Sequence, residues 1–545
     1  MSMKKKNNLV LQGSILAIAG IIARLIGLLR RIPLTNIIGN VGNAYYSTAY
    51  AIYSIMLIIS SYSLPLAVSK LVSARISKNQ YKNAQKAFHC AMIFAIASGG
   101  IAFAVVEIFA DWIANEFVMT PMSAMALKVL GPALLIVSVM GVLRGYFQGI
   151  GTMMPTAVSQ IIEQIFVVIV SISGAMVLFG RGEKVGALLH NENYAPAYGA
   201  AGASLGPVVG AIVGLGFLIL IYMAYRPKMK YQIRKDVNSK EESYGTLFRI
   251  ILLTIVPVLL STTVYNISEF IDIRIYNQVM IEKGFAELKD DYWGVYTGQY
   301  KILINVPLAL ANAMSSSVVP VLTGLLVRSQ LKDIEQKINQ AMRFTMMITI
   351  PSAVGLAVLA RPIITMLFPN EGDLGINLLQ IGSISVVFLS MSTLTNGVLQ
   401  GINKINVPVR NAVIALVLHV AALYLMLQMD MGIQGVVYSN ILFAVIMCVL
   451  NALAIRKELH YHQEWVRTFA IPAISALIMG GVIIGLNKLL SSLVGNILSV
   501  VLCITVGVVV YFVSLILLKG LTETDLKSMP GGRTLLTIAK KCKLM

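Results

Sequence analysis

The chain has 545 residues, of which 57% are hydrophobic and only 12% are charged, and its formal net charge is +19. A soluble domain of this composition would expose a very large apolar surface, so the composition excludes an ordinary soluble protein. The basic residues stand in short loops between apolar runs, where anionic lipid headgroups account for them, so nucleic-acid binding is not expected.

Apolar runs long enough to cross a bilayer recur along the whole chain. About 20 residues of helix cross the hydrocarbon core, and runs of this length exceed the strands of a membrane barrel. We therefore predict an all-α polytopic membrane protein. Its fourteen expected transmembrane helices lie near 9–30, 46–69, 87–108, 125–147, 155–179, 199–224, 248–272, 297–326, 344–368, 376–400, 408–428, 433–455, 468–487 and 492–518.

The first run follows three lysines, as a signal peptide does, but it continues past the small residues that resemble a cleavage site, so we expect an uncleaved first helix. Most of the 43 Lys and Arg residues fall in the N-terminal tail, in every second loop and in the C-terminal tail. Because cytoplasmic loops carry the excess of Lys and Arg, we predict that both termini face the cytoplasm. The protein itself is expected in the cytoplasmic membrane.

An internal repeat organises the chain. Residues 145–155 read GYFQGIGTMMP and residues 397–408 read GVLQGINKINVP, each a helix end, a tight turn and a proline that opens the next helix. Pro65 and Pro320 each precede a basic stretch in the same way. The repeat predicts two pseudo-symmetric six-helix bundles, 1–225 and 248–458, joined by a cytoplasmic linker, 226–247. Two added helices in 459–520 and a cytoplasmic tail, 521–545, complete the expected organisation.

Two bundles of the same orientation are expected to be related by an axis along the membrane normal, with a central cleft between them. In the first helix, Gly20, Arg24, Gly27 and Arg31 recur at three- and four-residue steps and share one face, which suits the wall of a wet cleft. Inserting a charged side chain at the centre of a membrane helix costs about 2.5–3.5 kcal/mol, so Arg24 is a candidate functional residue. Arg30 and Arg31 are candidates too, although side chains there could instead reach the outer headgroups.

Helix 7 ends with Glu269, Asp272 and Arg274, and the two carboxylates could bind a coupling cation or pair with the arginines of helix 1. An outer-interface cluster is the alternative for these residues. Lys301 lies about a turn inside helix 8, where a partly buried ammonium favours a functional role. Glu163 and His419 are single polar residues within spans, and we interpret both as packing residues.

Arginine matches phosphate oxygens in paired geometry, so an excess of cations within the spans indicates an anionic substrate. Nothing indicates catalysis: no Gly-x-x-x-x-Gly-Lys-Ser/Thr motif is present, and the longest outer loops lack a paired-acid constellation. Neither a cofactor nor a metal is expected. Four cysteines have no metal-ligand spacing and are expected to be reduced, namely Cys90, Cys448, Cys503 and Cys542.

The segment from Ala23 to Arg30, in which two arginines bracket Gly27, is followed by Ile37-Ile38-Gly39 and Asn43-Ala44-Tyr45-Tyr46. Together with Tyr300-Lys301 ahead of Pro307 and Pro320, these motifs resemble the oligosaccharidyl-lipid flippases of the MOP superfamily, above all the MurJ and SpoVB/YtgP-like families. Arg31 stands where MurJ-type sequences usually have Asp, and the region from Ser54 to Ile58 lacks the basic residue of MurJ helix 2. Both departures favour the SpoVB/YtgP branch.

The resemblance implies a MATE-like fold and a lipid II flippase, which carries undecaprenyl-pyrophosphate-linked disaccharide-pentapeptide between leaflets by alternating access. It implies that Arg24, Arg30 and Lys301 hold the pyrophosphate, with Arg31 beside them, while the lipid tail stays in the bilayer. Coupling to Na⁺, to H⁺ or to the membrane potential would bias the cycle, and the cell-wall synthesis machinery would be a partner.

Three alternatives remain at this point. A flippase for another polyprenyl-linked glycan and a MATE-type multidrug or cation antiporter share the architecture. A MATE-type pump needs carboxylates in its N-terminal half, where this chain offers mainly Arg24 and Glu163. A membrane-embedded glycosyltransferase or polymerase is the alternative outside transport, and it would need acidic or His residues in a sizeable outer loop.

Overall fold

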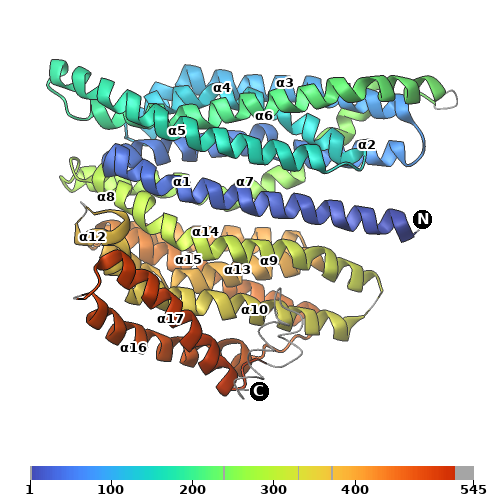
Figure 1. The fold of residues 1–545 in the computed structure, drawn as a ribbon. Coiled ribbons are helices and arrows are strands. Elements are labelled where there is room, and N and C mark those ends of the chain that lie inside the picture. The colour runs from blue at the N-terminus through green and yellow to red at the C-terminus, as the bar shows by residue number, and fades with distance from the viewer. Residues whose placement is uncertain (1–2, 237–239, 329, 370–371, 492, 522–545) are drawn as a thin grey trace. The chain divides into compact units, whose positions relative to one another are not determined.

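The computed structural model describes residues 3–236, 240–328, 330–369, 372–491 and 493–521, and every regular element in these ranges is helical. The chain divides into two compact units, Met1–Gly298 and Gln299–Met545. Figure 1 traces the helices of both. The boundaries that the sequence predicts for the two bundles, the linker and the added helices stay predictions, and the predicted tail lies outside the described residues from position 522 onward.

The first unit contains ten helical segments up to its boundary (Figure 1). They are α1 (Met3–Leu57), η1 (Ile58–Tyr62), α2 (Leu64–Ile76), α3 (Tyr81–Trp112), η2 (Ile113–Phe117), α4 (Ser123–Gly149), α5 (Met154–Leu189), α6 (Tyr194–Lys235), α7 (Tyr244–Glu282) and α8 (Lys289–Val295).

Helix α1 continues through the segment that the sequence analysis left between its first two spans. Only Gly39 interrupts it, with φ +69° and ψ 179°. That conformation is open to glycine and strained for a residue with a Cβ. One glycine therefore separates the helix that carries the arginines from the helix that carries Tyr46.

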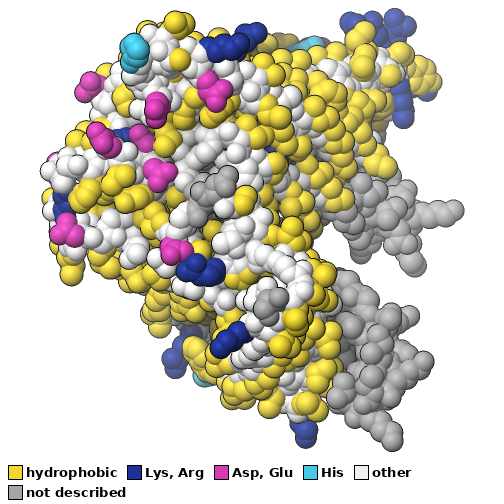
Figure 2. Space-filling model, turned by 60° about the vertical axis from the view of Figure 1, so that its left-hand side comes forward, with side chains coloured by type: hydrophobic (Ala, Val, Ile, Leu, Met, Phe, Trp, Pro, Cys, Tyr) yellow, Lys and Arg dark blue, Asp and Glu magenta, His cyan; other side chains and the backbone are white. Residues whose placement is uncertain are grey.

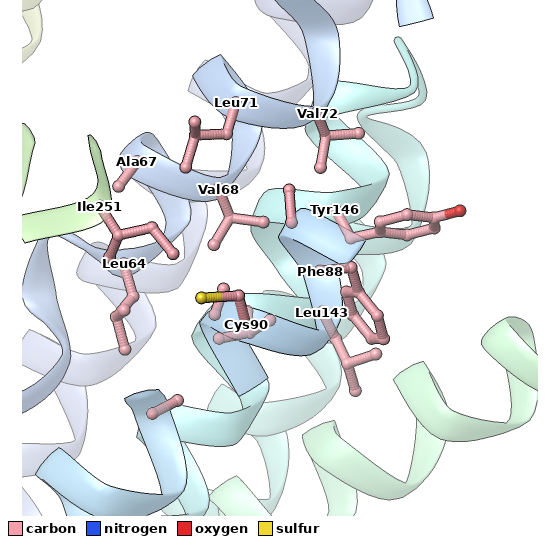
Figure 3. Packing of buried hydrophobic residues seen from close by; sticks show 14 of the residues in the cluster. Leu64, Ala67, Val68, Leu71, Val72, Phe88, Cys90, Leu143, Tyr146 and Ile251 are labelled. Atoms are coloured by element: carbon pink, nitrogen blue, oxygen red, sulfur yellow. The ribbon is translucent and has the colours of Figure 1, made fainter. Parts of the chain in front are cut away.

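The apolar core of the first unit lies where α2, α3, α4 and α7 meet (Figure 3). Gly145 of α4 makes this close packing possible, because a Cβ there would lie 2.7 Å from the Pro65 carbonyl oxygen of α2. A Cβ at Gly149 would lie 2.8 Å from Cβ of Val72. The buried side chains around this contact include Leu64, Val68, Leu71, Phe88, Leu143, Tyr146 and Ile251.

The segment between α6 and α7 is bound to the turn between α2 and α3. Asp236 accepts a hydrogen bond from the Lys82 backbone N–H at 2.9 Å, and the buried Arg75 forms a 2.5 Å ion pair with Glu242. Further contacts join Asn83 to Lys240 and Glu242, and Lys86 to Glu241. The described parts of this segment therefore belong to the first unit.

The second unit begins within η3 (Tyr296–Tyr300) and continues through helices that cover the rest of the described chain. They are α9 (Lys301–Val327), α10 (Leu331–Val358), α11 (Ala360–Leu367), α12 (Asp373–Gly382), α13 (Ser385–Gly401), α14 (Asn406–Gln428), α15 (Gly432–Leu459), η4 (Val466–Ala470), α16 (Ile471–Leu490) and α17 (Asn496–Leu517).

The two matched sequence motifs make the same kind of contact, each in its own unit. A Cβ at Gly397 of α13 would lie 2.2 Å from the Ser315 Oγ of α9, and one at Gly401 would lie 2.9 Å from Cβ of Leu322. Helix α13 thus packs on α9 as α4 packs on α2. The repeat that was visible in the sequence corresponds to a repeated helix–helix contact.

Within the described residues, eleven helices are long and apolar enough to cross a membrane, or twelve when α12 and α13, bent by 47°, count as one span. Figure 2 shows hydrophobic side chains over most of the face in view, with charged side chains in a few places. The prediction of an all-α polytopic fold is confirmed, whereas the count of fourteen helices is not. Cys90, Cys448 and Cys503 are free and buried.

Candidate functional site

The Arg30 side chain is buried in the first unit, where it is only 7% exposed. Its Nη1 donates a 2.5 Å hydrogen bond to Ser171 Oγ of α5, and its Nη2 donates to the Tyr46 hydroxyl at 3.1 Å. The Nε–H has no acceptor among the described residues. A buried guanidinium with an unused donor lowers the stability of the fold, so packing alone does not explain an arginine at this position.

Close packing of α5 and α6 holds Ser171 in place. Ser171 donates its own proton to the Ala203 carbonyl oxygen at 2.8 Å. A Cβ at Gly206 would lie 1.9 Å from Ser171 Oγ, so only glycine fits beside that hydroxyl. The small residues of α6, Gly206 among them, let the helix approach α5 closely enough to support Arg30.

Arg31 lies over two tyrosine rings of the same unit. Its guanidinium carbon is 5.6 Å from the ring centre of Tyr46 and 5.9 Å from that of Tyr50, and the two rings stack at 5.8 Å. Within the described chain, neither Arg30 nor Arg31 forms an ion pair with a carboxylate. The two positive charges are therefore supported by hydroxyls and aromatic faces instead of by a counter-ion.

Arg24 has an exposed side chain on α1. Arg30 follows it by six positions, which is roughly 9 Å along a helix that rises 1.5 Å per residue. No hydrogen bond or ion pair joins Arg24 to another described residue. The structure therefore places two of the predicted arginines together around Tyr46 and leaves the third apart from them.

Sequence reasoning missed an ion pair inside the first unit. Arg144 of α4 contacts Glu163 of α5 at 2.7 Å, and its Nε donates to Ser159 Oγ at 3.1 Å. The two side chains are 13% and 18% exposed. A second charge within a predicted span was the available signal, because a lone Glu163 needed a partner. Glu163 thus has its cation within the same unit.

The residues predicted at the end of helix 7 have different surroundings. Arg274 donates from Nη1 to the Glu116 and Phe117 carbonyl oxygens, both at 2.9 Å, and so satisfies the C-terminal end of η2. Asp272 is buried and Glu269 is half-buried, and each has a partner. Among the described residues no group of His, Cys, Asp or Glu could hold a metal ion. A coupling role for this cluster stays a prediction.

Lys301 begins α9 in the second unit and is half-buried. The preceding Tyr300 is buried, and its hydroxyl donates to the Gly382 carbonyl oxygen at 3.2 Å and lies 3.1 Å from Ser385 Oγ. These contacts fix the start of α9 to the bend between α12 and α13. Because Lys301 and the arginines belong to separate units, a shared phosphate site stays a prediction.

An apolar groove of about 500 Å³ lies in the second unit between α9, α10, α11, α16 and α17. Ser352 and the hydroxyl of Tyr511 are the polar side-chain groups among its lining residues, and that hydroxyl donates to the Met347 carbonyl oxygen at 2.9 Å. The groove therefore suits an apolar chain and offers little to a polar headgroup. Its lining includes Leu303, Val306, Pro307, Ile348, Leu356 and Phe512.

Comparisons with known proteins match most of the chain. The family model described as polysaccharide biosynthesis protein matches residues 9–326, and the MatE model matches residues 301–425. The chain is 26% identical to the lipid II flippase MurJ of Bacillus subtilis (strain 168) over 86% of each chain. It is 22% identical to the stage V sporulation protein B of the same organism, over 95% of this chain and 97% of that one.

Solved structures share the fold. A lipid II flippase MurJ in an inward closed conformation matches with a TM-score of 0.65 at 15% identity, over 92% of this chain and 97% of that chain. An inward-facing MATE family multidrug transporter of the MOP superfamily matches with a TM-score of 0.61 at 17% identity, over 80% and 95%. At these identities the likeness concerns the fold alone, and it agrees with the expected MATE-like architecture.

Proposed function

The chain belongs to the polysaccharide biosynthesis protein family, within the MOP superfamily of flippases, and on that premise we propose that it carries an undecaprenyl-pyrophosphate-linked glycan, lipid II first, between the leaflets of the cytoplasmic membrane. The superfamily resemblance read from the sequence is thereby confirmed. The substrate, the membrane and the cytoplasmic placement of both termini belong to the proposal.

The observation that carries the proposal is the pair Arg30 and Arg31. Both guanidinium groups lie within a membrane-spanning unit without a carboxylate partner among the described residues. Such charges are expensive in the bilayer unless a ligand of opposite charge compensates them during the working cycle. A pyrophosphate offers closely spaced oxygens of the kind that arginine binds in pairs. Arg24 and Lys301 stay predicted contributors to the same recognition.

The apolar groove supports a substrate that keeps a long hydrocarbon chain. A polyprenyl tail gains nothing by leaving the bilayer, so a carrier must move the polar head while it leaves the tail in apolar surroundings. The groove between α9, α10, α16 and α17 would accept part of such a tail. Transport would proceed by alternating access without a chemical step, so the protein would not be an enzyme.

A MATE-type export of cations is the second candidate, because the MatE model matches residues 301–425. Cationic drugs require a carboxylate that can change partner. Glu163 in the first unit is already paired with Arg144, which favours the anionic substrate. A different polyprenyl-linked glycan remains compatible with the relatives, which include a sporulation protein as well as a lipid II flippase. The proposal also includes coupling to Na⁺, to H⁺ or to the membrane potential, and a partnership with the cell-wall synthesis machinery. These two parts rest on the family resemblance.

Complementation tests the proposal directly. Cells depleted of their own lipid II flippase would receive the wild-type chain, Arg30→Ala or Arg181→Ala at matched expression. Arg181 is an exposed cation on α5 and serves as the matched control. We expect rescue by wild type and by Arg181→Ala but not by Arg30→Ala. A folded, expressed wild-type protein that does not rescue would exclude lipid II and direct the search to another polyprenyl-linked glycan.

A further inference from the structure

A second cationic feature lies in the second unit, at the C-terminal end of α15 and in the connector that leads to η4. It is a pocket of about 450 Å³ that no part of the proposed transport uses. Four of its five lining residues are basic or can become so: Arg456, Lys457, His460 and His462, with Leu453 as the apolar member. We call this feature the α15 pocket.

The four basic side chains of the α15 pocket have no hydrogen bond or ion pair to another described residue. The neighbouring carboxylates are engaged elsewhere. Glu458 pairs with Lys404 at 2.8 Å, and Glu464 pairs with Arg343 at 3.2 Å. The pocket therefore keeps its positive charge, where an ordinary cluster of surface charges would include its own counter-ions.

The connector that carries the two histidines is anchored. Tyr461, only 7% exposed, does not line the pocket, and its hydroxyl donates to the Asn339 side-chain oxygen and also contacts Gln463. His460 adopts a left-handed conformation with φ +52°, which ends α15 and turns the chain. His460 and His462 therefore flank a fixed residue, which holds the backbone of the connector in place beside the pocket.

The part of α15 that leads to the pocket is apolar on the face that carries Arg456 and Lys457. Val449 and Leu453 are 53% and 57% exposed and precede Arg456 and Lys457 by the three- and four-residue steps that put residues on one side of a helix. Trp465, 67% exposed, follows in the connector, and tryptophan is enriched where membranes meet water. An exposed apolar strip that ends in unpaired cations matches the order of acyl chain and phosphate in a phospholipid.

Favourable interaction with the helix dipole alone would account for Arg456 and Lys457, because cations are stabilised near the last turn of a helix. It does not account for the hollow, for the two histidines that line it or for the exposed strip beneath it. We propose that the α15 pocket binds the phosphate headgroup of an anionic phospholipid from the surrounding leaflet, with an acyl chain along Leu453 and Val449. The site is independent of the substrate and of the proposed flippase activity.

Tryptophan fluorescence offers the test, because the chain has only three tryptophans and one of them, Trp465, follows the pocket. The full-length protein would be placed in phosphatidylcholine nanodiscs, and brominated phosphatidylglycerol or brominated phosphatidylcholine would compete to quench its fluorescence. Subtracting the signal of Trp465→Phe isolates the contribution of Trp465. We expect phosphatidylglycerol to bind near Trp465 more tightly by about fivefold for each basic residue that contacts it.

Two charge variants distinguish binding at the α15 pocket from a general attraction of anionic lipids to the positive protein surface. Arg456→Ala/Lys457→Ala should abolish the preference for phosphatidylglycerol, whereas Lys332→Ala/Lys337→Ala should keep it. The control pair removes the same charge from exposed positions on α10 that do not line the pocket. All four positions are exposed, so both variants should fold, and an unchanged elution volume and thermal midpoint would verify this.

Three results would overturn the proposal. Equal quenching by the two lipids in wild type would show that the pocket ignores headgroup charge. An equal loss in both charge variants would reduce the effect to net charge. Displacement of phosphatidylglycerol by millimolar inorganic phosphate, but not by chloride at the same ionic strength, would assign the pocket to soluble phosphate. Loss of flippase complementation in any of these variants would bear on the proposed function separately and would leave the lipid measurement unaffected.

Discussion

Arg30 of α1 donates a 2.5 Å hydrogen bond to Ser171 of α5, although 141 residues separate them in the sequence. The contact joins a charge that a span would not normally carry to a hydroxyl that is itself bound to the backbone of α6. Three helices therefore fix the direction of one guanidinium. This relationship makes the positioning of Arg30 testable separately from its charge.

Ser171→Ala should lower the stability of the protein by about 1–3 kcal/mol, because it leaves a buried guanidinium donor without an acceptor. Ser173→Ala is the matched control, since Ser173 is exposed on the same helix and donates only to the Ile169 and Val170 carbonyl oxygens of the preceding turn. The thermal midpoint in detergent measures both. Equal midpoints for the two variants would show that the bond to Ser171 contributes nothing.

Arg30→Lys should lose most of the rescue in complementation, even though it keeps the positive charge. A lysine presents its donors from a single nitrogen, so it cannot reproduce the fixed geometry in which the guanidinium donates from separate nitrogens to Ser171 and Tyr46. Arg24→Ala should also reduce rescue if this exposed cation takes part in recognition. Growth at matched expression gives the comparison, and full activity of Arg30→Lys would leave charge alone as the requirement.

Glu163→Gln and Arg144→Ala should each destabilise the first unit by roughly 3–5 kcal/mol, because each leaves one member of a largely buried ion pair unpaired. The double variant should be more stable than the sum of the single losses predicts. A double-mutant cycle on denaturant unfolding measures the coupling. A coupling energy near zero would mean that the pair is solvated in the working protein.

Gly39→Ala should destabilise the break in α1 by about 1–2 kcal/mol, since an L-residue at positive φ is strained whatever space surrounds it. Gly100→Ala is the control, because Gly100 lies within α3 and a Cβ there would meet nothing within 4 Å. The control should be neutral or stabilising. Identical thermal midpoints for both alanine variants would indicate that the backbone at Gly39 can relax.

Acid should loosen the segment before α7. The Lys86 ammonium hydrogen-bonds to Glu241 and holds the pKa of that carboxyl below its ordinary value. The pair therefore contributes stability above the unfolded pKa of Glu241 and loses it as the pH falls through the lowered pKa of the folded state. Limited proteolysis near residue 240 at decreasing pH measures this loss. Glu241→Gln should be cleaved at a rate that depends less on pH than the rate for wild type.

The sequence predicted the helices well because each apolar run is long and the bilayer leaves few alternatives to a helix. It also predicted that Gly145 and Gly397 occupy matching positions. The continuity of α1 past residue 30 was missed, since polar and small residues there resemble a loop until Gly39 is seen to be the only break. Helix boundaries in such regions depend on packing that local composition does not encode.

The candidate site was predicted only in part. Arg30 and Arg31 were named as candidates, with the outer headgroups as the alternative. Tyr46 was noted only as part of a family motif and Ser171 not at all, because a hydroxyl in a span is common and carries no sign of its partner. Arg144 was missed because Glu163 was considered alone. Arg274 was grouped with Glu269 and Asp272 as a candidate ion-coupling or outer-interface cluster, and its bonds to two backbone carbonyl oxygens of η2 became apparent only in three dimensions.

The glycines at 145 and 149, and again at 397 and 401, bring one helix backbone against its neighbour in each unit. Such a contact depends on the absence of a Cβ, so almost any substitution at these glycines destabilises the packing. The surrounding apolar residues can be replaced by other apolar residues. Two units built on such contacts can therefore differ at nearly every other position and still keep the same helix–helix framework. The four glycines would be the most persistent sign of the repeat in the sequence.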